Sequence, residues 1–436
     1  MRFLFKKIDN TTLIVFRIIF GCVLMLEAWG SIFTGWIKLT FVEPKIHFSF
    51  IAFSWLQPID GFGMYYIYAV MGALGLCVIL GNFYRFSIIS YTILWTYCYL
   101  IHKASYNNHY YLMILLCLIM CFLPAHKSHS LDVKKGRVLK EIAMPFWCKF
   151  ILMFQITCVY FFGAMAKIYP DWLDGTYTKL KLGREIKTPL VGQFFKEEWF
   201  YMGVAYGGFL FDLLIIPLLI YKRTRVFAFI VSIAFHSFNS FVFQVGVFPY
   251  LSLAFAIFFF PVDRIRKIFL PKKELYLETA YSSNPSNKKT VLFLLSSYIV
   301  LQLFLPLRQH FLEGNVFWTE EGHKMSWRMM LRTTSGITRF KIYDVKKDST
   351  YILKPTILSR KQKNLINTRP DVIWQYAQYL KKEEAKKGNE IKVYAISNKK
   401  LNNRRYQEFI DPNVDLANTK WDYFNHAKWI YKFNGW

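Results

Sequence analysis

Long apolar runs, separated by short polar stretches, fill the chain as far as about residue 307. Each run is roughly 16–24 residues long, close to the ~20 residues that a helix needs to cross a ~30 Å bilayer core. The pattern predicts a polytopic α-helical membrane protein with about nine transmembrane helices. The expected spans are 12–35, 62–82, 85–102, 109–124, 145–167, 200–221, 225–243, 246–262 and 290–307.

The loops between these segments fall into two alternating sets that differ in charge. The first set is basic, with little acid beside it, and the second is longer, mixed in charge and rich in Trp and Pro. The positive-inside rule places the basic set in the cytoplasm. We therefore expect a cytoplasmic N-terminus and, after nine spans, a C-terminal part outside. The basic set includes Lys6, Lys7, Arg85, Lys134, Lys135, Arg137, Lys222 and Arg223.

The residues after 307 follow a different pattern. Several short stretches alternate between apolar and polar residues, as strands do, and 371–387 has the spacing of an amphipathic helix. We therefore expect two domains, a helical membrane domain over 1–307 and an extracytoplasmic α+β domain over 308–436. The expected strands are 326–331, 337–345, 351–354 and 390–396.

Composition and charge agree with a lipid bilayer as the main partner. Hydrophobic residues make up 54% of the 436 residues, and the net charge of +27 comes largely from the loops and the last third. Topology signals and an anionic membrane surface explain that charge, so no nucleic-acid partner is expected. The chain has no Gly-rich phosphate loop, no GxSxG, no HExxH and no Cys/His spacing typical of a metal site.

Three groups of polar residues lie at one depth in this topology, near the outer face. The loop 103–109 enters the fourth span, Lys167 ends the fifth, and His236 and Asn239 lie in the outer half of the seventh. Ionisable groups at membrane depth are costly and usually face a bundle interior or a cavity. The three groups together therefore predict a polar site beneath an apolar roof.

Lys167 has two interpretations. A lysine at the end of a span is more often an anchor whose ammonium group reaches the interface. Alternatively, burial disfavours the ammonium form, and the neutral amine can then act as a base. A substrate that enters sideways from the lipid, such as a quinol, suits a base in this position.

The other polar residues also have plain structural interpretations. Asn108 can lie at a helix start, where Asn is favoured, and His236 can be a satisfied interior histidine. We interpret Arg17, Glu27 and Asp212 as structural residues that pair with one another or cap backbone groups across spans.

Five stretches carry a likeness to a known family, in order, within a match that runs from about Phe16 to about Trp429. They are Lys103–His109, Phe161–Trp172, Phe235–Ser240, Trp318–Met330 and Phe409–Asp415. They resemble the vitamin K-dependent γ-glutamyl carboxylases, including the bacterial relatives that share the membrane domain. In that family a lysine deprotonates vitamin K hydroquinone, and O₂ adds to the resulting anion. The oxygenated product removes a γ-proton from a glutamate side chain, CO₂ captures the carbanion, and the vitamin leaves as its epoxide.

The resemblance implies roles for eight residues. It gives the base to Lys167 and the orientation of the hydroquinone to His109 and Asn108. It places His236 and Asn239 in the core around the vitamin. The region linked to glutamate binding matches Trp318, His323 and Trp327.

We therefore expect a vitamin K-dependent carboxylase and epoxidase, a carbon–carbon lyase, in a bacterial cytoplasmic membrane. Its co-substrates would be reduced menaquinone or phylloquinone, O₂ and CO₂, and its acceptor a glutamate-containing protein or peptide; no metal or haem is expected.

Two alternatives stay open. The first is quinol epoxidation without carboxylation, because Glu320, Glu321 and His323 differ from the less charged region of the animal enzymes. The second is a non-catalytic membrane protein that binds or transports a lipid or solute. A haem protein that uses His109 and His236 is disfavoured, because no pattern pairs them at one mid-membrane level.

Overall fold

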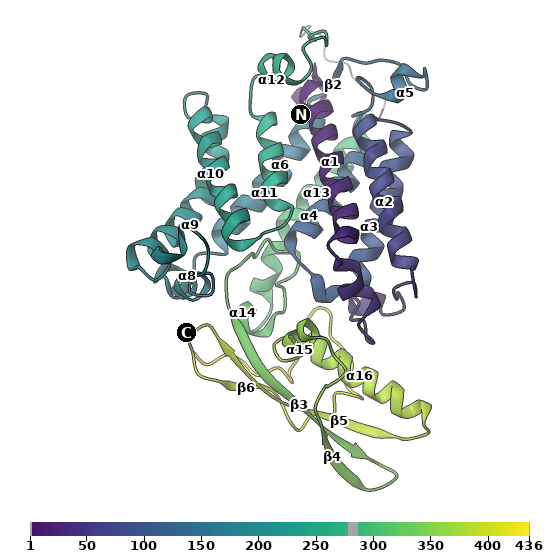
Figure 1. Ribbon diagram of the computed structural model, residues 1–436, viewed down its shortest axis with the longest axis vertical. Coiled ribbons are helices and arrows are strands. Elements are labelled where there is room, and N and C mark those ends of the chain that lie inside the picture. Colours follow the sequence, from purple (N-terminus) through teal and green to yellow (C-terminus); the bar gives the residue numbers. More distant parts are fainter. Residues whose placement is uncertain (1, 278–286, 436) are drawn as a thin grey trace.

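A bundle of long helices sits beside a smaller domain built on a sheet (Figure 1). The computed structural model describes residues 2–277 and 287–435. Every expected span coincides with a helix. These helices are α1 (Thr11–Phe33), α2 (Gly63–Leu80), α3 (Tyr84–Ile101), α4 (Asn108–Phe122), α6 (Phe146–Met165), α9 (Glu198–Ile220), α10 (Arg225–Phe243), α11 (Phe248–Phe255) and α13 (Lys288–Leu307).

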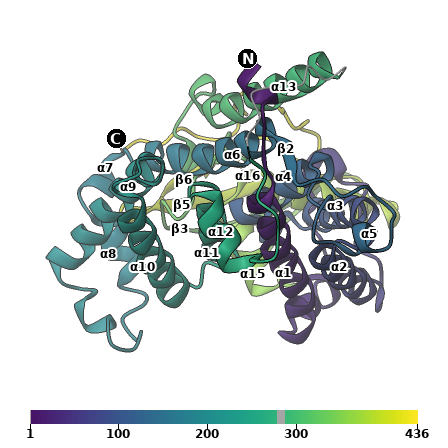
Figure 2. The same cartoon turned by 90° about the horizontal axis from the view of Figure 1, so that it is seen from above.

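Six of these helices in the described ranges are long and apolar enough to cross a membrane: α1, α2, α6, α9, α10 and α13. The apolar helices at 108–122 and 248–258 are shorter, and α3 is rich in Tyr, Ser and Thr. The protein is therefore a multi-pass membrane protein, and nine crossings stay a prediction. Seen along the bundle, α8 (Thr176–Leu182), α9 and α10 lie to one side and α2 and α3 to the other (Figure 2).

The basic loops gather at the end of the bundle farthest from the sheet domain (Figure 1). There β1 (Lys7–Asp9) pairs with β2 (Ala143–Pro145), near α5 (Leu131–Lys134) and α12 (Val262–Phe269). Arg17 is buried and donates to the carbonyls of Ala125 and His129, at 3.0 and 2.7 Å. This agrees with its interpretation as a structural residue that caps backbone groups.

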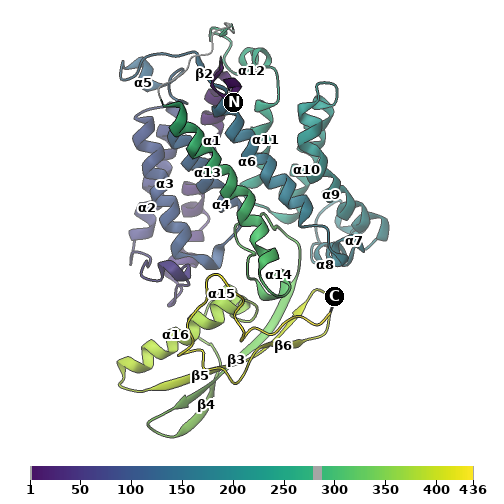
Figure 3. The same ribbon diagram turned by 180° about the vertical axis from the view of Figure 1, so that it is seen from behind.

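The C-terminal domain is an antiparallel sheet of strand order β4-β3-β5-β6, and the helices α15 and α16 pack on it. Alternate residues of β5 are buried, as expected for a sheet with one covered face. Both helices lie between the sheet and the bundle (Figure 1), and α13 leads down the back of the bundle into α14 (Figure 3). The elements are α14 (Val316–Thr319), β3 (Thr334–Asp344), β4 (Ser349–Leu353), α15 (Arg360–Ile366), α16 (Pro370–Lys386), β5 (Ile391–Leu401) and β6 (Gln407–Ile410).

The expected strand at 326–331 is wrong. The segment is irregular, and Trp327 and Met330 have left-handed backbones with φ of 57° and 50°. Its polar backbone groups bond to the bundle in place of a neighbouring strand. The Asn108 side chain donates to the Arg328 carbonyl at 2.8 Å, and the Tyr169 hydroxyl donates to the Leu331 carbonyl. The hydrogen bonds to the bundle therefore outweigh the tendency of this alternating apolar and polar sequence to form a strand.

A buried charge cluster joins the sheet domain to the bundle. Asp371, at the start of α16, pairs with Lys103 at 2.8 Å and also with Lys324. Burial raises the pKa of Asp371, but these two ammonium groups more than offset it and hold that pKa well below its usual range. Burial also lowers the pKa of Lys103 to about 8. The cluster therefore makes a buried carboxylate part of the contact that docks the domain on the bundle.

Asp371→Asn is expected to lower the free energy of unfolding by about 3–5 kcal/mol, because it leaves buried ammonium groups without a counter-charge. Thermal unfolding of the purified protein in micelles measures the loss. A depressed carboxyl pKa stabilises the fold above the unfolded pKa, and this gain is lost as the pH falls through the folded pKa. The difference between wild type and variant should thus persist from neutral pH down to about pH 4 and shrink below it.

Glu383→Gln on the same helix is the matched control, because Glu383 pairs with Lys386 at the surface. Its expected effect is below about 1 kcal/mol. An Asp371→Asn variant as stable as this control would contradict the role given to the cluster.

Candidate functional site

A cavity of about 230 Å³ lies between α6, α8, α9 and α10, and Trp327, Met329 and Met330 from the segment after α14 also line it. Its walls are mostly apolar and aromatic, with a few polar groups among them, as is typical of small-molecule sites. Phe238 and Phe248 contribute aromatic walls. The polar side chains include Lys167, Asp212, His109, Asn239, Lys181, Thr178, Tyr160, Tyr177 and Trp327.

Lys167 follows the end of α6, where the chain turns into α7 (Pro170–Leu173) with Pro170 at the first helical position. The residue is only 8% exposed. Its Nζ donates to the Gly208 carbonyl at 3.1 Å and to the Asp212 carboxylate, both on α9. Lys167 therefore points into the bundle and is not an anchor that reaches the interface.

Asp212 is the functional candidate that sequence reasoning missed. It was interpreted as structural, whereas it lines the cavity and pairs with Lys167. Gly163 on α6 makes room for it, because a Cβ there would lie 2.9 Å from Asp212 Oδ2. The carboxylate favours the ammonium form of its partner and burial disfavours both charges. The site thus holds a coupled pair, whereas a lone lysine was expected.

Two of the polar residues that were predicted to converge, His109 and Asn239, line the cavity, whereas His236 contacts it only through Tyr160. His109 lines the cavity and stacks on Phe248, with ring centroids 4.9 Å apart. Asn239 lines it from α10. His236 is fully buried behind the wall, and its Nε2 lies 2.9 Å from the hydroxyl of Tyr160, a residue that does line the cavity.

Two polar atoms at the cavity are buried without a hydrogen-bond partner in the described ranges, His109 Nδ1 and Trp327 Nε1. Buried polar atoms normally have partners, so each such atom calls for an explanation. An apolar ring that carries oxygen atoms would pack on the aromatic walls and supply hydrogen-bonding groups. The cavity therefore fits a small aromatic ligand with polar oxygens.

The segment 326–330 forms a thin wall between this cavity and a groove of about 610 Å³. Trp327, Met329 and Met330 line the cavity, whereas Ser326 and Arg328 line the groove. Asn108 does not line the cavity and instead holds this wall in place through the Arg328 carbonyl.

Arg328 brings a positive charge to the groove. Its guanidinium lies 5.0 Å from the Phe317 ring centre. Burial lowers its pKa to about 10. No carboxylate of the described residues pairs with it.

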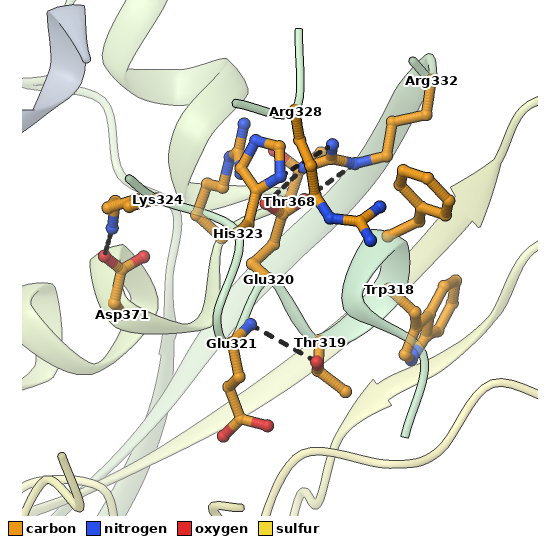
Figure 4. A network of polar contacts seen from close by, with 12 residues as sticks. Trp318, Thr319, Glu320, Glu321, His323, Lys324, Arg328, Arg332, Thr368 and Asp371 are labelled. Atoms are coloured by element: carbon orange, nitrogen blue, oxygen red, sulfur yellow. Dashed lines mark hydrogen bonds and ion pairs between the residues drawn. The ribbon is translucent and has the colours of Figure 1, made fainter. Parts of the chain in front are cut away.

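Trp318 and His323 lie in a polar network of the sheet domain (Figure 4), and neither residue lines the cavity. The Glu320 carboxylate pairs there with Arg332 and Arg369, and Lys399 lies 3.7 Å away. Trp318 is fully buried and donates to the Tyr431 carbonyl at 2.8 Å. Burial, together with the nearby Arg332, holds the pKa of His323 well below its usual value. The network fixes the loop that carries both residues.

Two family models cover nearly the whole chain. Residues 5–264 match the HTTM domain, and residues 287–435 match the lumenal domain of vitamin K-dependent gamma-carboxylase. The chain belongs to the vitamin K-dependent gamma-carboxylase family. No solved structure matches it. The sheet domain is the lumenal, or extracytoplasmic, domain of this family, and the sequence resemblance is confirmed.

Membership of the gamma-carboxylase family implies vitamin K as the cofactor. The hydroquinone of vitamin K is an aromatic ring with two hydroxyl groups. The cavity fits it, because two unpartnered polar atoms there, His109 Nδ1 and Trp327 Nε1, can bond to those hydroxyl groups. Within the described ranges, no three His, Cys, Asp or Glu side chains group closely enough to bind a metal ion.

Lys167 and Asp212 should contribute to the free energy of unfolding as a coupled pair. Lys167→Met alone leaves a buried carboxylate, and Asp212→Leu alone leaves a buried ammonium, so each is expected to cost about 3–5 kcal/mol. The double variant removes both charges and should recover most of that loss. Unfolding in micelles would measure this cycle, and additive losses would show that the two groups do not interact.

Proposed function

We propose that this protein is a vitamin K-dependent carboxylase and epoxidase. It would oxidise vitamin K hydroquinone with O₂ to the epoxide and couple this to CO₂ addition at the γ-carbon of a protein glutamate. The observation that carries the proposal is the buried Lys167–Asp212 pair on the wall of an apolar cavity. Reduced menaquinone or phylloquinone would supply the redox chemistry when bound.

The pair offers a way to generate a neutral base in an apolar site. Transfer of a proton from Lys167 Nζ to Asp212 Oδ2 leaves an amine beside a carboxylic acid. Apolar surroundings favour this neutral arrangement over two separate charges. The Nζ amine then accepts the proton of a quinol hydroxyl, while the Gly208 carbonyl, 3.1 Å away, keeps the amine in place.

The remaining polar groups of the cavity would orient the ring. The Trp327 indole N–H can donate to a quinol oxygen, and His109 can bond to a second oxygen through its free ring nitrogen. Asn239 offers an amide on the α10 side. His236 would act indirectly, because its hydrogen bond fixes the hydroxyl of Tyr160, which lines the cavity.

The groove on the far side of the 326–330 wall would hold the peptidyl glutamate. Its Arg328 guanidinium can pair with a substrate carboxylate, and its Phe161 and Phe317 side chains can cover the aliphatic part of the side chain. Only the 326–330 segment would then separate the glutamate from the cavity.

Quinol epoxidation without carboxylation is a second candidate, favoured by one observation. Glu320 already pairs with Arg332, Arg369 and Lys399. Of these cations, Arg332 lies 3.4 Å from His323 Nδ1, and Lys399 donates to the Trp318 carbonyl. The glutamate-binding role expected for Trp318 and His323 would have to compete with that carboxylate. Epoxidation needs only the base, the quinol and O₂.

We further propose a bacterial cytoplasmic membrane as the location, with the N-terminus in the cytoplasm. Support comes from the basic loops, which lie together at the end of the bundle opposite the sheet domain (Figure 1).

Lys167→Ala should abolish epoxide formation by the purified protein supplied with vitamin K hydroquinone and O₂. Loss of a general base typically lowers the rate by about 10²–10⁴. Lys179→Ala on α8 is the matched control, because Lys179 is exposed and does not line the cavity. The Lys167→Met/Asp212→Leu variant, with both buried charges removed, separates loss of chemistry from loss of folding. Wild-type turnover by Lys167→Ala would rule out the base assignment.

Arg328→Gln should lower the ratio of CO₂ fixed into a glutamyl peptide to epoxide formed. Loss of a charged hydrogen bond to the substrate carboxylate is expected to reduce kcat/KM for the peptide roughly 10- to 100-fold. Arg339→Gln on the exposed side of β3 serves as the control. Epoxide without CO₂ fixation in the wild type would support the epoxidase alternative, and an unchanged ratio in the variant would contradict the role of Arg328.

A further inference from the structure

A second hollow lies on a different face of α10 from the cavity. This groove has a volume of about 810 Å³ and runs between the end of α10, the start of α11 and the loop after α8. The α10 residues that line it include Ser237, Ser240 and Phe241, whereas Phe235, Phe238 and Asn239 line the cavity. The groove is therefore a separate site.

The groove opens on a face of the bundle suited to contact lipid. α10 is long and apolar enough to span a membrane, and it exposes Phe227, Ile230 and Ile233 along its length. The groove itself has an apolar wall of Phe241, Pro249 and Leu253. An occupant must therefore carry an apolar part.

A buried histidine with one unpartnered ring nitrogen lies among the residues that line this groove. His236 lines it and is fully buried, and its Nε2 is satisfied by the Tyr160 hydroxyl at 2.9 Å. Its Nδ1 has no hydrogen-bond partner in the part of the chain that the structure describes. Because a buried polar atom without a partner is costly, this nitrogen points to an occupant that also carries polar groups.

The rim of the groove carries excess positive charge. Arg184 and Lys187 are exposed there, and no carboxylate of the described residues pairs with either. Glu185 between them is already paired with Lys181 at 3.2 Å. Two positive charges are thus available to an anion at the membrane surface.

We propose that this groove binds one anionic phospholipid of the outer leaflet. Its phosphate lies at Arg184 and Lys187, its glycerol esters lie against the serine hydroxyls and His236, and an acyl chain follows the apolar wall. A quinol has no anionic group to place at the two cations. A choline headgroup would bring its own cation to the rim. The site does not depend on the proposed enzymatic activity.

The test is lipid retention by the full-length protein. The protein is purified from micelles that contain equal amounts of phosphatidylglycerol and phosphatidylcholine with the same acyl chains, and native mass spectrometry counts the lipids that remain bound. One phosphatidylglycerol per chain is expected. Arg184→Gln/Lys187→Gln should weaken its retention by about tenfold or more, because each basic residue near a membrane surface contributes to binding an anionic lipid.

Lys45→Gln/Lys196→Gln is the matched control, because it removes two exposed lysines that do not line the groove. It should retain phosphatidylglycerol as the wild type does. Equal retention of the two lipids, unchanged retention by Arg184→Gln/Lys187→Gln, or retention of a quinone in place of the lipid would each overturn the proposal.

Discussion

Two opposite charges, on Lys167 and Asp212, meet where the surrounding helices exclude water. Neither charge is tolerable there alone, so the end of α6 and the middle of α9 must stay in register. The glycines at this crossing serve the same contact. Gly163 leaves space for the carboxylate, and Gly208 offers a carbonyl to the ammonium group. Lys167 and Asp212 join the end of α6 to α9, Tyr160 and His236 join α6 to α10, and aromatic side chains line the space between these helices.

The lumenal domain completes the site because it is docked by charge as well as by apolar contact. Asp371 anchors α16 to Lys103, in the loop that leads into α4, and to Lys324, in the segment after α14. The same contact holds the 326–330 segment against the bundle, where Trp327 lines the cavity. A family domain that is outside the membrane thus supplies part of the wall of a site within it.

Sequence patterns predicted the long apolar helices, α16 and three strands, β3, β4 and β5, because apolar periodicity reflects burial directly. They did not predict the partner of Lys167, since pairing across 45 positions leaves no local signal and Asp212 reads like any other polar residue in a span. The family resemblance placed both His236 and Asn239 around the vitamin. Asn239 lines the cavity, whereas His236 lies behind its wall and lines the neighbouring groove. The strand expected at 326–331 failed because bonds to the bundle replaced those of a sheet.

The alternation of the 326–330 wall has a consequence for how this protein can change over evolutionary time. Ser326 and Arg328 face one chamber while Trp327 and Met329 face the other. Insertion or deletion of one residue would displace the side chains on both sides of the wall together and shift the Arg328 carbonyl away from Asn108. Point substitutions can adjust either chamber separately, but a change in the length of this segment alters both chambers at once.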